Sequence, residues 1–434
     1  MRSHIIIVSV FILFSLFASC SKEKKVISPV VEIISPGYSQ LFLLPDTIII
    51  KFNITHTTSI EYIRTSIDNK NLTPISEQSF IYPVGITYQG NVQLELSIIP
   101  EIIMKSPYFV HIVVSDFNQL HHYYLEIDIK NSDKVYKGFF LIDESSINRL
   151  TINYYDSLAE KVFDTIINGD FSDSDISSSS ELLYINITTP DLSRSFNIKN
   201  GNLEWTQMPQ LPYPEFTGIT VDDNMVYLST AIGRIIGLTT NDGLQVFTTL
   251  VLPDTIPHNV CVTNNYLLAD FTLRHSQKQV WVSYYKQTGS KYQVFPTDYK
   301  TENMYYNDVS DKMILFCNKQ NTGQVITFDI VTNITLGEPI IFDNNINHSC
   351  RIDNDKYLFS SEKSIYLFNY SYNSFVKVYQ TNQDIVDLDF DVLSNKVFVV
   401  QSQKLEIITY PDFNYITSIE SENTLKSIEL LYGY

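Results

Sequence analysis

The chain has 434 residues, which is too long for one ordinary hydrophobic core, so we expect two or three domains. Its formal net charge of −18 at pH 7 argues against nucleic acid and anionic lipid surfaces as partners, because both require basic patches. The 29 Tyr and 26 Phe residues, set against only 14 Gly, favour an all-β protein.

The chain begins with a segment typical of secretion. A short basic start, Met1 to His4, precedes an apolar run from Ile5 to Ser19 that is too short to span a bilayer. The stretch Leu16-Phe17-Ala18-Ser19-Cys20 resembles the bacterial lipobox, in which the cysteine thiol is diacylated and the signal is cut before it. We expect residues 1–19 to be a lipoprotein signal peptide; an ordinary signal peptide with a chance cysteine is the alternative.

The resemblance implies that Cys20 is lipidated. Several acyl chains, each methylene contributing about 0.8 kcal/mol on burial, hold a soluble domain stably at a membrane surface. Residues 20–27 are mostly polar and suit a flexible tether. We therefore expect an extracytoplasmic protein with a lipid anchor in a bacterial membrane, at the outer membrane or the cell surface.

Residues 28–131 predict an Ig-like β-sandwich, because short strand-like runs alternate with turn residues over about a hundred positions. The runs are Val30–Gly37, Asp46–Phe52, Ile60–Asp68, Val92–Ile98, Tyr108–Asp116 and Tyr123–Ile129. Their order resembles the Ig-like or PKD-like modules that follow the lipid anchor in many Bacteroidota surface lipoproteins. The cysteine pair and strand-C tryptophan of antibody domains are missing.

From residue 134 the sequence repeats a pattern of apolar strand, Asx-rich turn and second strand. The second strands are centred at Phe140, Leu183, Tyr227, Leu267, Ile314, Tyr357 and Val397. Seven centres about 43 residues apart predict a seven-bladed β-propeller over residues 134–434.

The two ends of this repeat predict how the ring closes. The tail Leu425–Tyr432 has the pattern of a first strand with no second strand after it, and the segment at Phe140 is a second strand with no first. We expect the C-terminal strand to complete the first blade and leave no open edge.

The segments Gly218–Leu228 and Lys137–Glu144 resemble blades of YncE-like or quinoprotein-type propellers. WD dipeptides, kelch double glycines and the tryptophan-docking motif of quinoprotein enzymes are absent, and the only tryptophans are Trp205 and Trp281. No sequence fingerprint of a hydrolase, metalloprotease, P-loop or dinucleotide site occurs either. We therefore expect no cofactor and no enzymatic activity.

Two histidines of the propeller occupy matching positions, since His258 and His348 each lie nine residues before a second-strand centre. Tyr305 is assigned to the corresponding position of the blade between them. Such residues would lie near the opening of the central channel, where they could bind a polar ligand or a metal. Coincidence between repeats of unequal length is the alternative.

Three carboxylates, Asp170, Asp173 and Asp175, fall within six residues and have the oxygen chemistry that calcium prefers. The glycine and final glutamate of an EF-hand are missing, so a solvated loop between strands is the favoured interpretation. The Asx residues at 222–224, 263–265 and 353–355 are interpreted as turn chemistry between adjacent strands rather than as a site.

Adjacent His121 and His122 are expected to point to opposite faces of a half-exposed edge strand, which argues against a shared metal site. Cys261, Cys317 and Cys350 are expected to be buried free thiols; a Cys261–Cys350 disulfide is the alternative.

The function favoured by the sequence is a membrane-anchored binding module whose propeller recognises a glycan, a small nutrient or a protein. The first alternative is a scaffold that assembles an outer-membrane complex. The second is an enzyme, such as a lyase or hydrolase, that would use the channel histidines and tyrosine; function has to be argued from such a site rather than from the fold.

Overall fold

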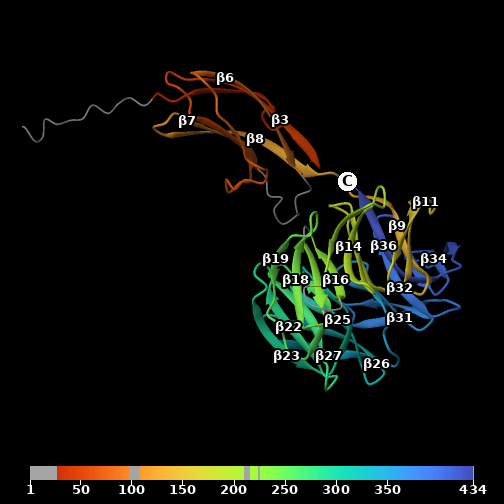
Figure 1. Ribbon diagram of the computed structural model, residues 1–434. Coiled ribbons are helices and arrows are strands. Elements are labelled where there is room, and N and C mark those ends of the chain that lie inside the picture. Colours follow the sequence, from red (N-terminus) through yellow and green to blue (C-terminus); the bar gives the residue numbers. More distant parts are fainter. Residues whose placement is uncertain (1–26, 97–106, 210–215, 223–224, 434) are drawn as a thin grey trace, which may run out of the picture. The chain divides into compact units, whose positions relative to one another are not determined.

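The computed structural model describes residues 27–96, 107–209, 216–222 and 225–433. Contacts divide the chain into two units, Met1–Ser132 and Asp133–Tyr434 (Figure 1). The described residues form strands and turns without helices, so the expected all-β class is confirmed, and no helix that could cross a membrane occurs among them. The signal peptide, Cys20 and most of the tether lie outside the described residues.

The first unit is a β-sandwich. One sheet has the strand order β1-β3-β6 and the other has the order β2-β8-β7-β4-β5. The strands are β1 (Val30–Ser35), β2 (Leu41–Leu44), β3 (Asp46–Thr55), β4 (Tyr62–Asp68), β5 (Ser79–Ile81), β6 (Thr87–Leu96), β7 (Tyr108–Ser115) and β8 (Leu120–Asn131).

Alternation of apolar and polar residues builds the sandwich core. Every second residue of β6 is buried, as expected for a strand with one face in water. Phe52 and Ile54 of the first sheet pack in one cluster with Ile63 and Ile112 of the second. Each such side chain contributes about 1.5–3 kcal/mol on burial, so this shared core joins the two sheets.

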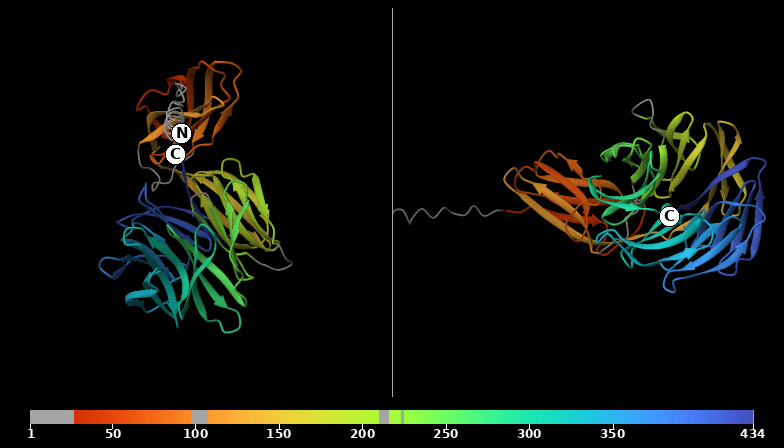
Figure 2. Two further views of the ribbon diagram at one scale, coloured as in Figure 1. Left: turned by 90° about the vertical axis from the view of Figure 1, so that its left-hand side faces the viewer. Right: turned by 90° about the horizontal axis from the view of Figure 1, so that it is seen from below.

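The second unit is a propeller of seven four-stranded sheets, and the expected architecture is confirmed (Figure 2). The first four blades consist of β11-β10-β9-β36, β12–β15, β16–β19 and β20–β23. Their strands are β9 (Val135–Ser146), β10 (Arg149–Asp156), β11 (Lys161–Asn168), β12 (Phe171–Ser177), β13 (Leu182–Thr188), β14 (Asp191–Asn197), β15 (Leu203–Gln207), β16 (Phe216–Asp222), β17 (Met225–Thr230), β18 (Arg234–Thr239), β19 (Gln245–Thr248), β20 (Thr255–Val262), β21 (Tyr266–Leu273), β22 (Gln279–Tyr285), β23 (Lys291–Thr297) and β36 (Thr424–Gly433).

Blades 5, 6 and 7 consist of β24–β27, β28–β31 and β32–β35. Their strands are β24 (Lys300–Asn307), β25 (Lys312–Lys319), β26 (Thr322–Asp329), β27 (Ile334–Phe342), β28 (Ser349–Arg351), β29 (Lys356–Ser361), β30 (Ser364–Asn369), β31 (Ser374–Gln380), β32 (Ile385–Asp391), β33 (Lys396–Gln401), β34 (Lys404–Thr409) and β35 (Tyr415–Glu420).

The C-terminal strand closes the ring as expected. Strand β36 pairs antiparallel with β9, placing Ile428 opposite Leu141 and Glu429 opposite Phe140. It also contacts the innermost strands β12 and β32 of the blades on either side. In Figure 2 the blue end of the chain accordingly lies beside the yellow strands of blade 1. Closure removes the open edge between the first and last blades.

The innermost strands share an irregularity. In six of the seven, the pairing with the second strand shifts by one residue near the start; these shifts fall at Phe171/Asp173, Phe216/Gly218, Pro257/Val260, Thr301/Asn303, Ile385/Asp387 and Leu425/Ser427. A bulge of this kind redirects the side chains that follow it. As a result, Asp173 reaches the backbone N–H of Ile219 in the next blade at 2.8 Å, and Asp387 reaches that of Ile428 at 3.0 Å.

Packing between blades is largely aromatic and aliphatic. Between blades 5 and 6, Phe316 lies with its ring centroid 5.7 Å from that of Tyr357 and 5.9 Å from that of Phe359. Cys261, Cys317 and Cys350 are buried as free thiols, which confirms the favoured interpretation over a Cys261–Cys350 disulfide.

Candidate functional site

The three residues expected at the channel opening each contact a different group of the protein. The His258 Nε2 atom lies 3.0 Å from Thr272 Oγ1 within its own blade. The Tyr305 hydroxyl donates to the carbonyl oxygen of Ser349 at 2.6 Å. His348 Nδ1 lies 4.0 Å from Asp387 Oδ1. Each side chain therefore has a partner of its own.

Tyr305 was assigned to the wrong position of its repeat. Its partner across the sheet is Ile314, whereas the residue that directly follows the bulge is Asn303, opposite Phe316. The Tyr305 ring packs 5.3 Å from that of Tyr357, and burial, with the nearby Cys350 thiol, raises the pKa of its hydroxyl well above the usual range. Tyr305 is thus an interior hydroxyl whose hydrogen bond links blades 5 and 6.

The channel instead contains a cluster of carboxylates on three neighbouring innermost strands. Its members are Asp173 and Asp175 of β12, Asp387 and Asp389 of β32, and Glu429 of β36. Ser174 of β12 donates to Glu429 Oε1 of β36 at 2.5 Å. Ser427 donates to Asp387 Oδ2 of β32 at 3.1 Å and lies 3.1 Å from the Ser174 hydroxyl. Two serines and two carboxylates therefore connect blades 2, 1 and 7 through the closing strand.

Burial raises the pKa of most carboxyl groups in this cluster. The pKa reaches about 7 at Asp173, about 6 at Asp175 and about 8 at Asp389. In Asp389 the negative charges of Asp387 and Asp175 add to the effect of burial, and the pKa of Glu429 is likewise held well above its usual range. At neutral pH part of the cluster is therefore protonated, which reduces repulsion across the ring.

The favoured interpretation of Asp173 and Asp175 as part of a solvated loop is wrong. Both lie on β12, an innermost strand, and their carboxylates accept hydrogen bonds from the N–H groups of Ile219 and Val221 in the next blade. Asp170 precedes this strand and accepts a hydrogen bond from the N–H of Asn148 at 3.0 Å. No three His, Cys, Asp or Glu side chains are arranged to hold a metal ion within the part of the chain that the structure describes.

A second polar region lies on blade 4 and reaches blade 5, on the face where their innermost strands end. A hollow of about 590 Å³ is lined by Asn264, Asn265, Tyr266, Tyr285, Gln287, Thr288 and Ser290. A smaller hollow of about 110 Å³ shares the first three of these residues and continues to Tyr306, Asp311 and Lys312. We call the two adjoining hollows the tyrosine groove. Its larger part has the size of an ordinary small-molecule pocket, about 300–1,000 Å³.

The rings of Tyr266 and Tyr285 line the larger hollow and form its tyrosine wall, and the ring of Tyr292 packs against both. The ring centroid of Tyr266 lies 4.8 Å from that of Tyr292 and 5.6 Å from that of Tyr285. The centroids of Tyr285 and Tyr292 are 5.3 Å apart, and Tyr285 is 44% exposed. Because these rings come from β21, β22 and β23, the sheet itself fixes their spacing.

The β20–β21 turn positions the polar side of the groove. Thr263 Oγ1 accepts the N–H of Tyr266 at 2.9 Å, which is the turn chemistry expected from the sequence. Asn264 donates to the Tyr306 hydroxyl at 3.0 Å, and this hydroxyl donates to Asp311 at 2.8 Å. Burial and the hydrogen bond to Asp311 raise the pKa of Tyr306 to about 12, so it remains a neutral donor.

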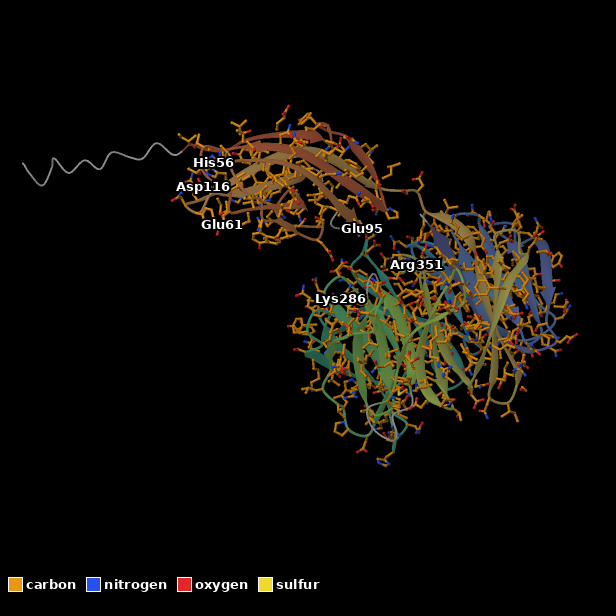
Figure 3. The ribbon with its side chains drawn as sticks, turned by 45° about the horizontal axis from the view of Figure 1, so that its top comes forward. His56, Glu61, Glu95, Asp116, Lys286 and Arg351 are labelled. Carbon is orange, nitrogen blue, oxygen red and sulfur yellow. The ribbon has the colours of Figure 1, made fainter. Side chains whose placement is uncertain are left out.

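The lysines at the groove are neutralised by aspartates. Lys312 Nζ lies 2.8 Å from Asp329 Oδ2, and Lys286 Nζ lies 2.5 Å from Asp222 Oδ2. Figure 3 labels Lys286 on this part of the propeller. The groove thus offers rings, amides and hydroxyls, with no cation free of a carboxylate partner among its described lining residues.

This groove was not predicted because Asn264 and Asn265 were attributed to turn geometry alone. The available signal was the tyrosine content of blades 4 and 5: Tyr266 begins a strand, Tyr285 ends one, and Tyr306 is the residue before the last of its strand. Tyrosine at an exposed strand end combines an apolar ring with a polar tip, which is typical of binding surfaces.

His121 and His122 of the sandwich point to opposite faces of β8, as expected. His121 Nε2 lies 3.4 Å from Asp116 Oδ2 on one face, and His122 Nδ1 lies 3.0 Å from His111 Nε2 on the other. Among the described strands, β8 pairs with β7 alone around these two residues, because its pairing with β2 begins only at Asp128, so the expected strand edge is confirmed at this point.

Asp116 anchors the end of the sandwich near these histidines. His56 Nε2 also lies 3.2 Å from its carboxylate, and Figure 3 shows His56 and Asp116 together at one end of the unit. Burial raises the pKa of Asp116, but the N–H groups of Gln119 and Asn118 and the two histidines outweigh it, so the pKa lies well below its usual range. This group stabilises the β7–β8 turn.

The fold defines an all-β protein in which a sandwich precedes a seven-bladed propeller closed by its C-terminal strand. No family model matches the sequence, and no curated protein matches it. Among solved structures, the chain is similar to a functionally unknown protein from Desulfotomaculum acetoxidans DSM 771, with 13% identity and a TM-score of 0.55 over 68% of this chain and 100% of that one.

Two further similar structures are BamB from Moraxella catarrhalis, at 11% identity and a TM-score of 0.41, and the computationally designed Ika8 protein, at 10% and 0.47. Each match covers 68% of this chain, with 92% of BamB and 91% of Ika8. At 13% identity, the match to the Desulfotomaculum acetoxidans protein shows the fold alone.

Proposed function

We propose that the protein is a lipid-anchored extracytoplasmic binding module whose propeller binds a small polar ligand in the tyrosine groove. The groove carries this proposal, because two adjoining hollows there combine aromatic rings with side chains that can donate and accept hydrogen bonds. The lipobox-like sequence ending at Cys20 supports the anchor and the location.

The channel is the weaker candidate for this role. Its carboxylates are already bonded to serines and to backbone N–H groups of neighbouring blades, so a ligand would have to replace contacts that close the ring. The groove residues Asn265 and Gln287 make no side-chain hydrogen bond to any described residue and are exposed, so their amides are available to a ligand.

The binding role is tested with the full chain purified in the detergent lauryldimethylamine oxide. A library of saccharides, amino acids, nucleotides and short peptides is screened by thermal shift for the wild type and for Tyr266→Ala. The proposal expects at least one compound that raises the Tm of the wild type and not that of the variant. A wild type that responds to no compound, while a defined membrane protein co-purifies in stoichiometric amount, would favour the scaffold role instead.

The anchor is tested separately in a bacterial host. Wild type and Cys20→Ala are labelled with an alkyne analogue of palmitate and fractionated. The proposal expects label for the wild type only. Because the signal is cut only before a lipidated cysteine, the variant keeps its apolar segment Ile5–Ser19, so the label and not membrane association is the readout. Equal labelling of both proteins contradicts the proposal.

A further inference from the structure

The tyrosine groove also restricts the chemistry of its ligand, and the following inference rests on the proposed function. We infer that the groove binds neutral oligosaccharides, with sugar rings packed against the tyrosine wall and their hydroxyl groups bonded to the amides and hydroxyls of the facing turns.

The tyrosine wall offers a broad aromatic surface. The ring centroids of Tyr266 and Tyr285 are 5.6 Å apart with their planes inclined by 36°, and both residues line the larger hollow. Two rings on the neighbouring strands β21 and β22 make a surface wider than one ring. A pyranose has flat faces of C–H groups, which pack on aromatic rings and lose contact with water in doing so. The wall therefore suits a ligand with repeated flat, partly apolar units.

The second argument is the polar lining. The amide side chains of Asn264, Asn265 and Gln287 and the hydroxyls of Thr288 and Ser290 supply donors and acceptors in one place. Sugar hydroxyls also donate and accept, so each can pair with either kind of atom. A ligand with acceptors only, such as a phosphate, would leave the amide oxygens without donors.

The third argument is charge. Phosphorylated and carboxylated ligands are held in proteins by free lysines or arginines. Lys312 of the lining is paired with Asp329, and nearby Lys286 is paired with Asp222. The remaining charged residue of the lining is Asp311, whose carboxylate accepts a hydrogen bond from Tyr306. An anionic ligand would meet a carboxylate without a compensating cation, so a neutral ligand is favoured.

The two hollows together favour a ligand of more than one unit. The hollow of about 590 Å³ adjoins the one of about 110 Å³, since Asn264, Asn265 and Tyr266 line both. The Asn264–Tyr306–Asp311 chain of hydrogen bonds borders the narrower hollow and holds its polar atoms in place before a ligand arrives. Two adjoining hollows, one wide and one narrow, fit a chain of sugars better than a single ring.

The test uses the full chain in lauryldimethylamine oxide, a detergent whose head group is not a sugar and so does not compete with saccharide ligands. Isothermal titration calorimetry is performed with neutral oligosaccharides of glucose, xylose, mannose and N-acetylglucosamine, and with heparin fragments and ATP as anionic probes. Four proteins are compared: the wild type, Tyr266→Ala, Tyr266→Phe and Tyr372→Ala. Tyr372, on a turn of blade 6, is 80% exposed and lies outside the groove, so it controls for the loss of a surface tyrosine.

The inference expects at least one neutral oligosaccharide to bind the wild type, with binding weakened at least about tenfold in Tyr266→Ala and by less than about threefold in Tyr266→Phe and Tyr372→Ala. Saccharide binding that Tyr266→Ala leaves unchanged overturns the assignment to this groove. Binding of an anionic or peptide ligand that depends on Tyr266 overturns the sugar class but leaves the proposed function standing. If no probe and no library compound shows binding that depends on Tyr266, both the sugar class and the proposed function are overturned.

Discussion

The carboxylate cluster of the channel and the tyrosine groove are built from the same repeat but use opposite parts of it. The cluster lies on innermost strands, where burial raises the pKa values of Asp173, Asp389 and Glu429. The groove lies at strand ends and turns, where Tyr285 and its neighbours remain open to solvent.

The difference teaches that charge alone does not identify the ligand site in this propeller. Enclosed carboxylates with raised pKa are often functional, but here their hydrogen bonds lead to neighbouring blades and to the closing strand. The cluster therefore holds the ring together. In the groove, by contrast, the side-chain amides of Asn265 and Gln287 make no hydrogen bond to any described residue and can bind a ligand. Variants of each region should separate these two roles.

The largest effect is expected from removing the closing strand. Deletion of residues 424–434 removes the buried side chains of Leu425, Ile428, Leu430 and Leu431. At about 1.5–3 kcal/mol each, their loss amounts to roughly 6–12 kcal/mol, comparable with the whole stability of a domain. Circular dichroism should show no cooperative unfolding transition for the propeller. A transition with unchanged Tm would mean that β36 and its cluster do not close the ring.

The next largest effect is the pH dependence of stability. The pKa values of Asp175, Asp173 and Asp389, about 6, 7 and 8 in the folded protein, exceed the usual value near 4 of the unfolded chain. Between about pH 4 and pH 8 the folded state therefore binds more protons, so the free energy of unfolding decreases as pH rises through this window.

Groups with lowered pKa act in the opposite direction at lower pH. Although burial opposes it, the Lys312 ammonium lowers the pKa of Asp329 to about 2, so its contribution is present above about pH 4 and is lost as pH falls toward 2. Urea unfolding should consequently show maximum stability near pH 4–5 and a decline up to pH 8. Constant stability between pH 5 and pH 8 would show that the cluster is not enclosed.

A smaller effect is expected when one carboxylate of the cluster is neutralised. Asp389→Asn removes a group whose pKa is raised to about 8 by burial and by Asp387 and Asp175. Above pH 8 the variant should be more stable than the wild type by about 1–3 kcal/mol, and below pH 5 the two should be similar.

Asp412→Asn is the matched control, since Asp412 is an exposed residue of the same blade. Its urea unfolding curve should follow that of the wild type at every pH. A stabilisation at high pH that is equal in both variants would reflect the net charge of the protein rather than the cluster.

The smallest effect is expected in the floor of the groove. Tyr306→Phe removes the hydroxyl that joins Asn264 to Asp311, at a cost of about 0.5–1.5 kcal/mol in stability. Ligand affinity should fall severalfold while the channel is unaffected, so the high-pH decline in stability should be unchanged. A variant with altered pH dependence would indicate that groove and channel are coupled.

The architecture could be predicted from the sequence because it depends on periodicity. Second-strand centres such as Tyr227 and Tyr357 recur at regular intervals, and the unpaired strand at Leu425–Tyr432 can only complete blade 1. These signals belong to single segments and survive small errors of alignment.

The sites could not be predicted in the same way. A bulge of one residue, such as that between Thr301 and Asn303, changes which side chain follows it, so Tyr305 was placed wrongly. The groove joins Tyr266 of blade 4 to Tyr306 of blade 5 across a distance set by blade packing. Neither the shift caused by the bulge nor the distance between the two blades can be read from the spacing of residues within one repeat.

The most direct test of the different roles is a crossed binding measurement. Affinity for the neutral oligosaccharide that binds the wild type is measured at pH 6.5 for a groove variant, Tyr266→Ala/Tyr285→Ala, and for a channel variant, Asp389→Asn. We predict a loss of at least about tenfold for the groove variant and a change of less than about twofold for the channel variant. Weakened binding in the channel variant with full affinity in the groove variant would contradict the account.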